Sequence, residues 1–289
     1  MLDAVLTTPW LLYLIVTFVS LCIGSFLNVV ILRLPKMMQQ DWRCQCEEFL
    51  ELPEAQRKPA GRITLSSPAS TCPSCGHRIR AWENIPVLSW LMLGGKCAAC
   101  KARISVRYPL IEALTAVISV VTVVLLGPTP AALWALLLVW ALVALTVIDL
   151  DTQLLPDSIT LPLLWLGLVL NYFGVLTDLE SAFWGAVAGY LSLWSVYWLF
   201  RLATGKEGMG HGDFKLLAAL GAWLGWPLLP AIILLSSLVG AIVGIGLIVF
   251  RQHGREVPIP FGPYLAAAGL LALWFGPEIQ QFWFGFLGV

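Results

Sequence analysis

Long uncharged runs separated by short polar segments dominate the chain and predict membrane-spanning helices. A bilayer core of about 30 Å requires roughly 20 apolar residues in an α-helix, because each residue advances the helix by about 1.5 Å. The run Trp10–Leu32 meets this length, and residues 127–130 divide the uncharged stretch after Glu112 into two further candidates. The pattern predicts an all-α polytopic membrane protein with about eight spans, near residues 10–32, 109–126, 131–148, 158–177, 181–200, 216–250 (two unequal pieces) and 263–286.

A polar insert at residues 33–108 interrupts this hydrophobic pattern. It holds 12 of the 17 basic and 6 of the 17 acidic residues, a net charge of +6 that leaves −6 for the rest of the chain. With the N-terminus outside, the insert and the loops 201–215 and 251–255 all fall inside, which places every Lys and Arg on the cytoplasmic side. We therefore predict three parts: a first transmembrane helix (1–32), a cytoplasmic insert (33–108) and a helical membrane domain (109–289).

The composition supports this class and excludes two others. Of 289 residues, 59% are apolar and 12% are charged, which is too little charge for the surface of a water-soluble domain of this size. The formal net charge is zero, so the chain lacks the excess positive charge of nucleic-acid-binding proteins, and we expect no nucleic-acid partner. The lipid bilayer is the expected environment.

Four of the seven cysteines form two CxxC pairs in the insert, Cys72 with Cys75 and Cys97 with Cys100, with 21 residues between the pairs. This spacing is close to that of zinc ribbons, in which four thiolates surround one Zn²⁺. Disulfides are the alternative, but a reducing cytosol disfavours them. Four thiolates leave no open coordination position, so a structural zinc is expected. No metal role is predicted for the other three cysteines, of which two lie in a charged, mobile stretch: Cys22, Cys44 and Cys46.

Acidic residues gather where apolar segments end. Asp149, Asp151 and Asp157 follow the third predicted span, and Asp213 closes the sequence GMGHGD at 208–213, on the same membrane face. Two carboxylates brought together share one proton, which places a general acid beside a general base, as in aspartic proteases. Helical geometry lets only one of Asp149 and Asp151 face Asp213, and the sequence leaves that choice open. A flexible loop with Asp213 as a helix N-cap is the alternative.

Other segments carry structural expectations. Gly210 and Gly212 would let a peptide backbone approach Asp213 closely and would permit positive φ. The apolar run 85–93 fits either the bilayer surface or the core of a small zinc domain. Two small-residue pairs predict close helix packing within the chain: Gly185 with Gly189, and Gly240 with Gly244.

Taken together, these residues resemble the bacterial type IV prepilin leader peptidases along the whole chain. The resemblance rests on GSFLNVVILRLP at 24–35, the CxxC quartet, RYPLIE at 107–112, Asp149–Asp151, the GxGD motif ending at Asp213, and FGPYL at 261–265. It implies that Asp149 and Asp213 are the catalytic pair of a peptidase in the bacterial inner membrane, with its active site on the cytoplasmic face. The implied substrates are prepilin and pseudopilin precursors, cut after a Gly that follows a short basic leader.

The same family N-methylates the new N-terminal residue, usually Phe, with S-adenosylmethionine as donor. The resemblance assigns this activity to the insert, with Gly94, Gly95 and Lys96 as the positions carried over for the methyl donor. The residues alone do not predict it, because no GxGxxG follows a strand. Two other hypotheses compete with this interpretation: a proton- or cation-coupled transporter with intramembrane carboxylates and a zinc-binding regulatory domain, and an assembly factor whose zinc domain binds a partner.

Overall fold

The computed structural model describes residues 9–53, 61, 63–251 and 259–287. Within these residues the regular structure is helical, and extended segments pair only at two isolated bridges, Thr71 with Arg78 and Lys96 with Arg103. The predicted all-α class is confirmed. The chain divides into two compact units, Met1–Trp140 and Ala141–Val289, and each is described by itself.

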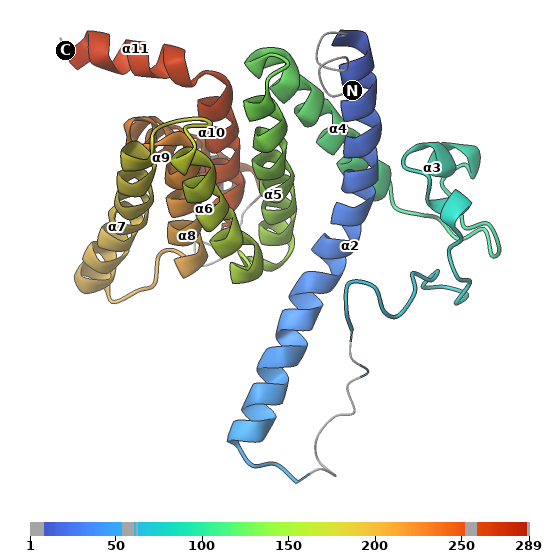
Figure 1. Cartoon of the computed structure of the whole chain (residues 1–289). Helices are drawn as coiled ribbons and strands as arrows, with labels where there is room; N and C mark the ends of the chain where they lie inside the picture. The colour runs from blue at the N-terminus through green and yellow to red at the C-terminus, as the bar shows by residue number, and fades with distance from the viewer. Residues whose placement is uncertain (1–8, 54–60, 62, 252–258, 288–289) are drawn as a thin grey trace. The chain divides into compact units, whose positions relative to one another are not determined.

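The first unit is built on the pairing of α2 (Pro9–Phe49) with α4 (Arg107–Leu126). The two helices approach closely at Gly24, where a Cβ atom would lie 2.7 Å from the Cα atom of Glu112. Aliphatic side chains of α2, α4 and the start of α5 (Pro130–Thr152) form the buried core of this unit: Leu12, Val16, Val123, Ala132 and Leu136. Two short elements, η2 (Ala81–Asn84) and α3 (Leu88–Met92), lie in the connection between α2 and α4 (Figure 1).

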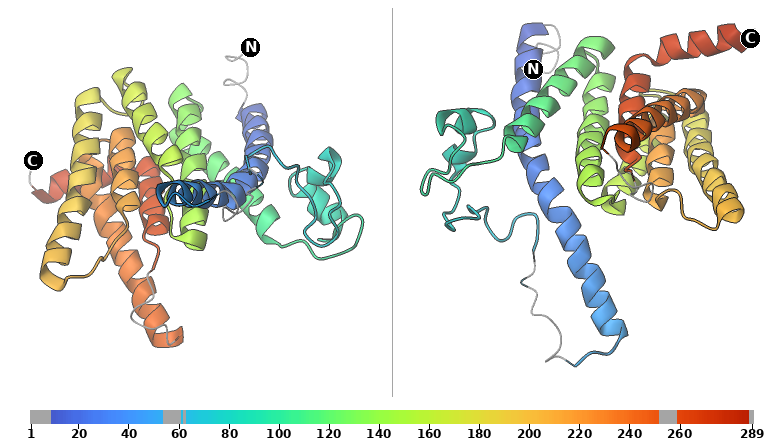
Figure 2. Two further views of the ribbon diagram at one scale, coloured as in Figure 1. Left: turned by 90° about the horizontal axis from the view of Figure 1, so that it is seen from below. Right: turned by 180° about the vertical axis from the view of Figure 1, so that it is seen from behind.

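α2 is longer than the apolar run predicts. That run ends at Leu32, whereas the helix continues to Phe49 with Pro35 inside it (Figure 2). Residues 36–49 contain no Gly or Pro and are rich in good helix formers, so nothing in them stops the helix. An i,i+4 ion pair between Arg43 and Glu47, at 3.6 Å, adds to it. Cys44 and Cys46 therefore lie in a regular helix.

α8 (His211–Leu224) is the central helix of the second unit. It is contacted by α6 (Asp157–Tyr172), α7 (Leu179–Thr204) and α10 (Gly262–Trp274). Every residue from 216 to 224 is buried. Because all sides of this helix are covered, its first turn, which carries the GxGD motif, is held in a fixed place by its neighbours.

Glycine contacts bring α7 and α8 together. A Cβ atom on Gly189 would lie 2.7 Å from the carbonyl oxygen of Leu217, and one on Gly185 would overlap the backbone of Gly221. The predicted packing through Gly185 and Gly189 is confirmed, and it takes place within the chain. At Gly240 the nearest atom to a Cβ would be in the Tyr264 ring, at 3.2 Å, so the second predicted pair also packs within the chain.

Local signals set the ends of these helices. Asp178 is the N-cap of α7, and its side chain accepts a hydrogen bond from the amide of Ser181 at 2.8 Å. Gly205 ends α7 with φ +69, and Gly225 ends α8 with φ +84, two left-handed conformations that favour glycine. The remaining helices are α9 (Leu229–Arg251), which follows η3 (Trp226–Leu228), and α11 (Gly276–Leu287).

Four helices in the described part of the chain are long and apolar enough to cross a membrane. They confirm a membrane protein with several spans: Pro9–Phe49, Arg107–Leu126, Pro130–Thr152 and Trp226–Gly246. The count of about eight is not confirmed, since α6, α8 and α10 have 16, 14 and 13 residues, fewer than the roughly 20 that a full crossing requires. The last predicted run is also divided at Phe275 into α10 and α11.

Candidate active site

Asp149 and Asp213 lie near each other in the second unit. Asp149 is in the last turn of α5, and Asp213 is in the first turn of α8. Both are buried, with 4% and 6% of their surface exposed, and the charge of Asp149 is near enough to act on Asp213. Two carboxylates that are distant in sequence thus occupy one desolvated site, where their like charges repel each other.

The start of α10 completes this site. The backbone amide of Gly262 donates a hydrogen bond to Oδ2 of Asp149 at 2.9 Å. A Cβ atom on Gly262 would lie 2.6 Å from the same oxygen, so only glycine lets the backbone come this close. Gly262 belongs to the FGPYL segment, and the sequence alone predicts no role for it. The contact spans 113 residues, and no local pattern could have found it.

Asp213 is not the N-cap of its helix, as the alternative interpretation required. Gly210 holds that position, and the amide of Asp213 donates to the carbonyl of Gly210 at 3.2 Å. Oδ1 of Asp213 is buried and has no hydrogen-bond partner among the described residues. A buried carboxylate oxygen without a partner is costly for stability, and it is available to a substrate, a water molecule or a proton.

The motif glycines act differently from the prediction. Neither Gly210 nor Gly212 has a positive φ, so left-handed backbone is not their purpose. A Cβ atom on Gly212 would lie 2.7 Å from Cβ of Leu155, so that space is filled by the chain itself. At Gly210 the nearest atom would be Oδ2 of Asp213 at 3.6 Å, an ordinary contact. Gly212 therefore lets α8 pack against the segment after α5, and Gly210 leaves the side next to Asp213 open.

Burial distinguishes Asp149 from its acidic neighbours. Asp149 is buried, whereas Asp151 and Asp157 are exposed. Asp157 begins α6 and forms an ion pair with Lys215 at 2.7 Å. This pair joins the starts of α6 and α8 and leaves Asp157 outside the site.

The four cysteines of the two CxxC pairs come together in the first unit. Their sulfur atoms all lie within 4.8 Å of one another, and Sγ of Cys72 is 3.8 Å from Sγ of Cys100. No disulfide joins them, since all four thiols are free. Each pair sits in a tight turn: the amide of Cys72 donates to His77 at 2.9 Å, and that of Cys97 donates to Ala102 at 2.8 Å. Such a set of four sulfur ligands fits a tetrahedral Zn²⁺.

At two of the four cysteines, backbone amides favour the thiolate form that a metal requires. Hydrogen bonding by the backbone of Ser74, and then of Cys75, lowers the pKa of Cys72 to about 6. The backbone of Cys100 lowers the pKa of Cys97 in the same way. His77, beside the first pair, is outside the sulfur cluster and lies 3.0 Å from Oε2 of Glu83 through its Nε2 atom.

Gly94 and Gly95 connect α3 to the second CxxC pair. Both have a positive φ, +61 and +66, so other residues would be strained there. A Cβ atom on Gly95 would lie 2.8 Å from the Trp90 ring, whereas one on Gly94 would meet nothing within 4 Å. Lys96 is exposed. The space beside Gly95 is thus occupied by Trp90, and the open positions are Gly94 and Lys96.

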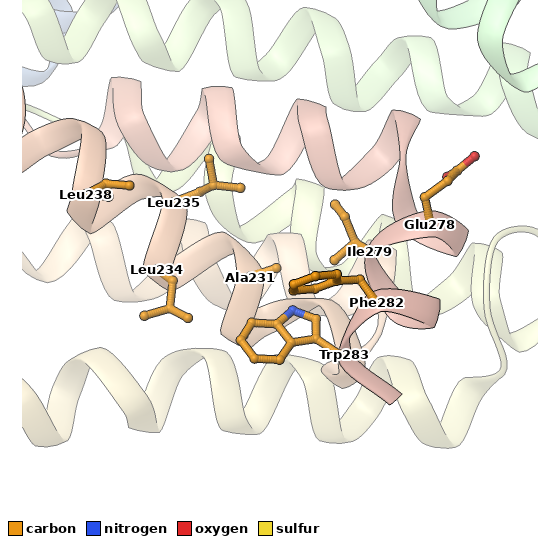
Figure 3. Close-up of a pocket in the computed structure, with 8 residues that line it drawn as sticks. All are labelled: Ala231, Leu234, Leu235, Leu238, Glu278, Ile279, Phe282 and Trp283. Atoms are coloured by element: carbon orange, nitrogen blue, oxygen red, sulfur yellow. The ribbon is translucent and has the colours of Figure 1, made fainter. Parts of the chain in front are cut away.

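An apolar pocket lies at the other end of the second unit (Figure 3). α9 begins after the end of α8 that is opposite to Asp213, and α11 follows the end of α10 that is opposite to Gly262. The pocket is therefore separate from the two aspartates. It lies between α9 and α11, and its lining residues are Ala231, Leu234, Leu235, Leu238, Glu278, Ile279, Phe282 and Trp283.

Comparisons with known proteins cover nearly the whole chain. Residues 18–126 match the bacterial peptidase A24 N-terminal domain, and residues 136–245 match the type IV leader peptidase family. A relative from Aeromonas salmonicida is 58% identical over 95% of this chain and 94% of its own length. One from Stutzerimonas stutzeri is 59% identical over 90% and 89%, and one from Pseudomonas aeruginosa is 53% identical over 100% and 99%.

Each of these three relatives is named prepilin leader peptidase/N-methyltransferase. No solved structure matches the chain with statistical significance.

Proposed function

The chain belongs to the type IV leader peptidase family, and on that premise we propose that it removes the leader from prepilins with Asp149 and Asp213 and then N-methylates the product. The transporter hypothesis finds no support, since the similar proteins carry the names of enzymes. The observation that carries the peptidase proposal is the meeting of two buried carboxylates, one of which has an oxygen with no partner among the described residues.

The geometry suggests different tasks for the two aspartates. Asp149 accepts a hydrogen bond from the amide of Gly262, which stabilises a negative charge, so Asp149 is suited to act as the base. Asp213, whose Oδ1 lacks such a donor, is suited to hold the shared proton. In this scheme Asp149 takes a proton from water as the water oxygen bonds to the scissile carbonyl carbon, while Asp213 gives its proton to the carbonyl oxygen.

Collapse of the resulting tetrahedral intermediate completes the peptidase reaction. The C–N bond breaks, Asp149 returns its proton to the leaving amine, and Asp213 regains a proton from the hydroxyl group of the intermediate. Both acids end in the state in which they began. The products are a leader with a new carboxylate and a pilin with a new N-terminal amine, which is the group to be methylated.

The charge distribution supports a cytoplasmic site in the bacterial inner membrane. The last turn of α7 carries Arg201, the loop that leads into Asp213 carries Lys206, and the insert 33–108 has a net charge of +6. Positive loops mark the cytoplasmic side. A precursor pilin or pseudopilin would keep its basic leader in water and its apolar segment among the helices, so the bond to be cut lies at the membrane boundary beside the two aspartates.

The insert is proposed to bind one Zn²⁺ and S-adenosylmethionine. Cys72, Cys75, Cys97 and Cys100 would hold the metal, which would fix the loop that carries Gly94 and Lys96. With Gly95 packed against Trp90, the methyl donor would contact Gly94 and Lys96. The new amine would attack the methyl carbon, the bond from that carbon to sulfur would break, and the amine would lose a proton to solvent.

One assay with two measurements tests this proposal. The purified protein is incubated in detergent with a precursor pilin and S-adenosylmethionine labelled in its methyl group, and both the loss of leader mass and the gain of label are followed. We expect Asp149→Asn and Asp213→Asn to prevent cleavage and to leave the methylation of an already cleaved pilin intact.

Asp178→Asn is the matched control, because Asp178 caps α7 away from the site and Asn is an equally good N-cap. It should cleave at the normal rate. Normal cleavage by either active-site variant would refute the assignment of these two aspartates. A wild-type protein that leaves precursor pilin uncut would refute the peptidase function itself.

A further inference from the structure

Part of the insert presents an exposed apolar surface beside α2 and α4. Five side chains of η2, α3 and the residues between them make up this surface, which we call the α3 patch. Their exposed fractions range from 41% to 85%. The members are Trp82, Ile85, Leu88, Leu91 and Met92.

The exposure of the α3 patch excludes one of the two interpretations given to the run 85–93. The core of a small zinc domain would bury these side chains, and they are not buried. A protein in water rarely leaves so many large apolar side chains together on its surface, because each costs free energy when hydrated. The patch therefore needs an apolar neighbour.

Two hydrogen bonds fix the patch to the membrane helices of the same unit. Val87 donates its backbone amide to Oε2 of Glu112 on α4 at 2.7 Å. Asn84 donates its side-chain amide to Oγ of Ser25 on α2 at 3.4 Å. Glu112 is itself buried, with 7% of its surface exposed, and Val87 is its donor on the insert. The segment that carries the patch is thus anchored at both ends of a short loop.

These anchors set the depth of the patch relative to the bilayer. Ser25 precedes the first charged residue of α2, Arg33, by eight residues, or about 12 Å along a helix. Glu112 lies five residues, or about 8 Å, inside Arg107 at the start of α4. Amphipathic segments at a membrane interface sit about 5–10 Å deep in the boundary between headgroups and acyl chains. The Glu112 anchor falls within this range and the Ser25 anchor lies about 2 Å deeper, so the anchored segment is expected near this boundary.

The surroundings of the patch fit the same environment. Phe26 and Leu110, which neighbour the two anchors on α2 and α4, are 50% and 62% exposed. Large apolar side chains are thus exposed on both helices close to the residues that anchor the patch. Exposed basic residues lie before and after the patch in the sequence, and Arg80 sits over the Trp82 ring at 5.2 Å. Such residues favour lipid headgroups: Arg78, Arg80, Lys96, Lys101 and Arg103.

We propose that the α3 patch is inserted into the headgroup and acyl-chain boundary of the bilayer, with Glu112 as the residue that holds it there. The insert then contacts the bilayer directly through the α3 patch, in addition to its connections to α2 and α4. The consequence is that Gly94 and Lys96, which follow α3 directly, lie close to the membrane surface. The lipid contact itself does not depend on either proposed activity.

Photo-crosslinking to lipid tests this proposal without any measurement of activity. The full-length protein carries p-benzoylphenylalanine in place of Met92, in bilayers of phosphatidylethanolamine and phosphatidylglycerol, and adducts are identified by the intact mass after irradiation. The matched control places the same group at Ser66. That residue is exposed in the same insert, next to Leu65, whose carbonyl accepts a bond from Arg33 at 3.4 Å, level with the first charge of α2.

We expect lipid adducts at position 92 to exceed those at position 66 at least several-fold. Adding Glu112→Ala should reduce the adducts at position 92 toward the control, whereas Glu112→Gln, which keeps an acceptor for Val87, should preserve them. Equal yields at positions 92 and 66, or crosslinks from position 92 to protein in place of lipid, would overturn the proposal. If Glu112→Ala fails to fold, the comparison of the two positions still decides it.

Discussion

Substituting Gly262 by alanine should slow leader cleavage while leaving both catalytic acids in the chain. In the structure a Cβ atom at this position would lie 2.6 Å from Oδ2 and 3.2 Å from Cγ of Asp149. Carbon and oxygen atoms do not approach this closely, so the carboxylate must rotate or shift. The φ of Gly262 is not positive, so alanine meets no strain in the backbone itself. The Cβ atom would also lie 3.2 Å from Cδ2 of Leu155, but the closest contact is with the Asp149 carboxylate.

The hydrogen bond from the Gly262 amide to Asp149 gives the size of the effect. At 2.9 Å it is a well-formed bond to a carboxylate, and bonds to charged groups contribute about 1.5–3 kcal/mol. If the shifted carboxylate loses this bond in the transition state, the rate falls tenfold for each 1.4 kcal/mol or so. Cleavage by Gly262→Ala should therefore be about tenfold to a hundredfold slower.

The measurement is the initial rate of leader removal from precursor pilin, followed by mass. Methylation of an already cleaved pilin should be unchanged in the same preparation, which shows that the protein is folded. Gly246→Ala is the matched control, since a Cβ atom there meets nothing within 4 Å, and it should cleave normally. A wild-type cleavage rate in Gly262→Ala would show that the contact between Gly262 and Asp149 has no part in the reaction.

Three further substitutions test the zinc site, the packing of α8 and the role of the acidic neighbour. Cys97→Ser should lower the zinc content measured by atomic absorption and impair methylation, with cleavage preserved; full zinc content would contradict the four-thiolate site. Gly221→Ala should destabilise the protein by about 1–3 kcal/mol or more, because its Cβ atom would overlap the backbone of Gly185, and thermal unfolding that matches wild type would disprove this. Asp157→Asn should change stability by less than about 1 kcal/mol and keep cleavage, since its ion pair with Lys215 is partly exposed; loss of cleavage would instead place Asp157 in the site.

Much of the fold follows from the sequence because hydrophobic length and helix signals are local. The runs that predict spans coincide with helices, and the glycine spacing at 185 and 189 predicts the approach of α7 to α8. The end of α2 could not be predicted in this way. Charge marks where a helix leaves the apolar core, but only a helix breaker stops it, and the first 14 residues after Pro35 contain none.

In the candidate sites, too, the features set by local spacing are predictable and those set by distant residues are not. The cysteine cluster is predicted by spacing alone, because each CxxC closes a local turn and the two turns need only meet. The choice of Asp149 over Asp151 needs burial, which depends on helices distant in the sequence. The hydrogen bond from the Gly262 amide to Asp149 cannot be predicted from the sequence for the same reason. Gly210 and Gly212 can be recognised as part of a sequence motif, but their roles follow only from their contacts. Gly210 leaves the side next to Asp213 open, and Gly212 packs against Leu155.

The proposed peptidase mechanism requires Asp149 and Asp213 to act as one unit. The most direct measurement is the single-turnover rate of leader cleavage for Asp149→Asn, Asp213→Asn and the variant with both substitutions. If the two carboxylates share one proton, removing either disables the pair, and the double variant should be no slower than the slower single variant. Losses that multiply in the double variant would show two independent groups and contradict the shared-proton mechanism.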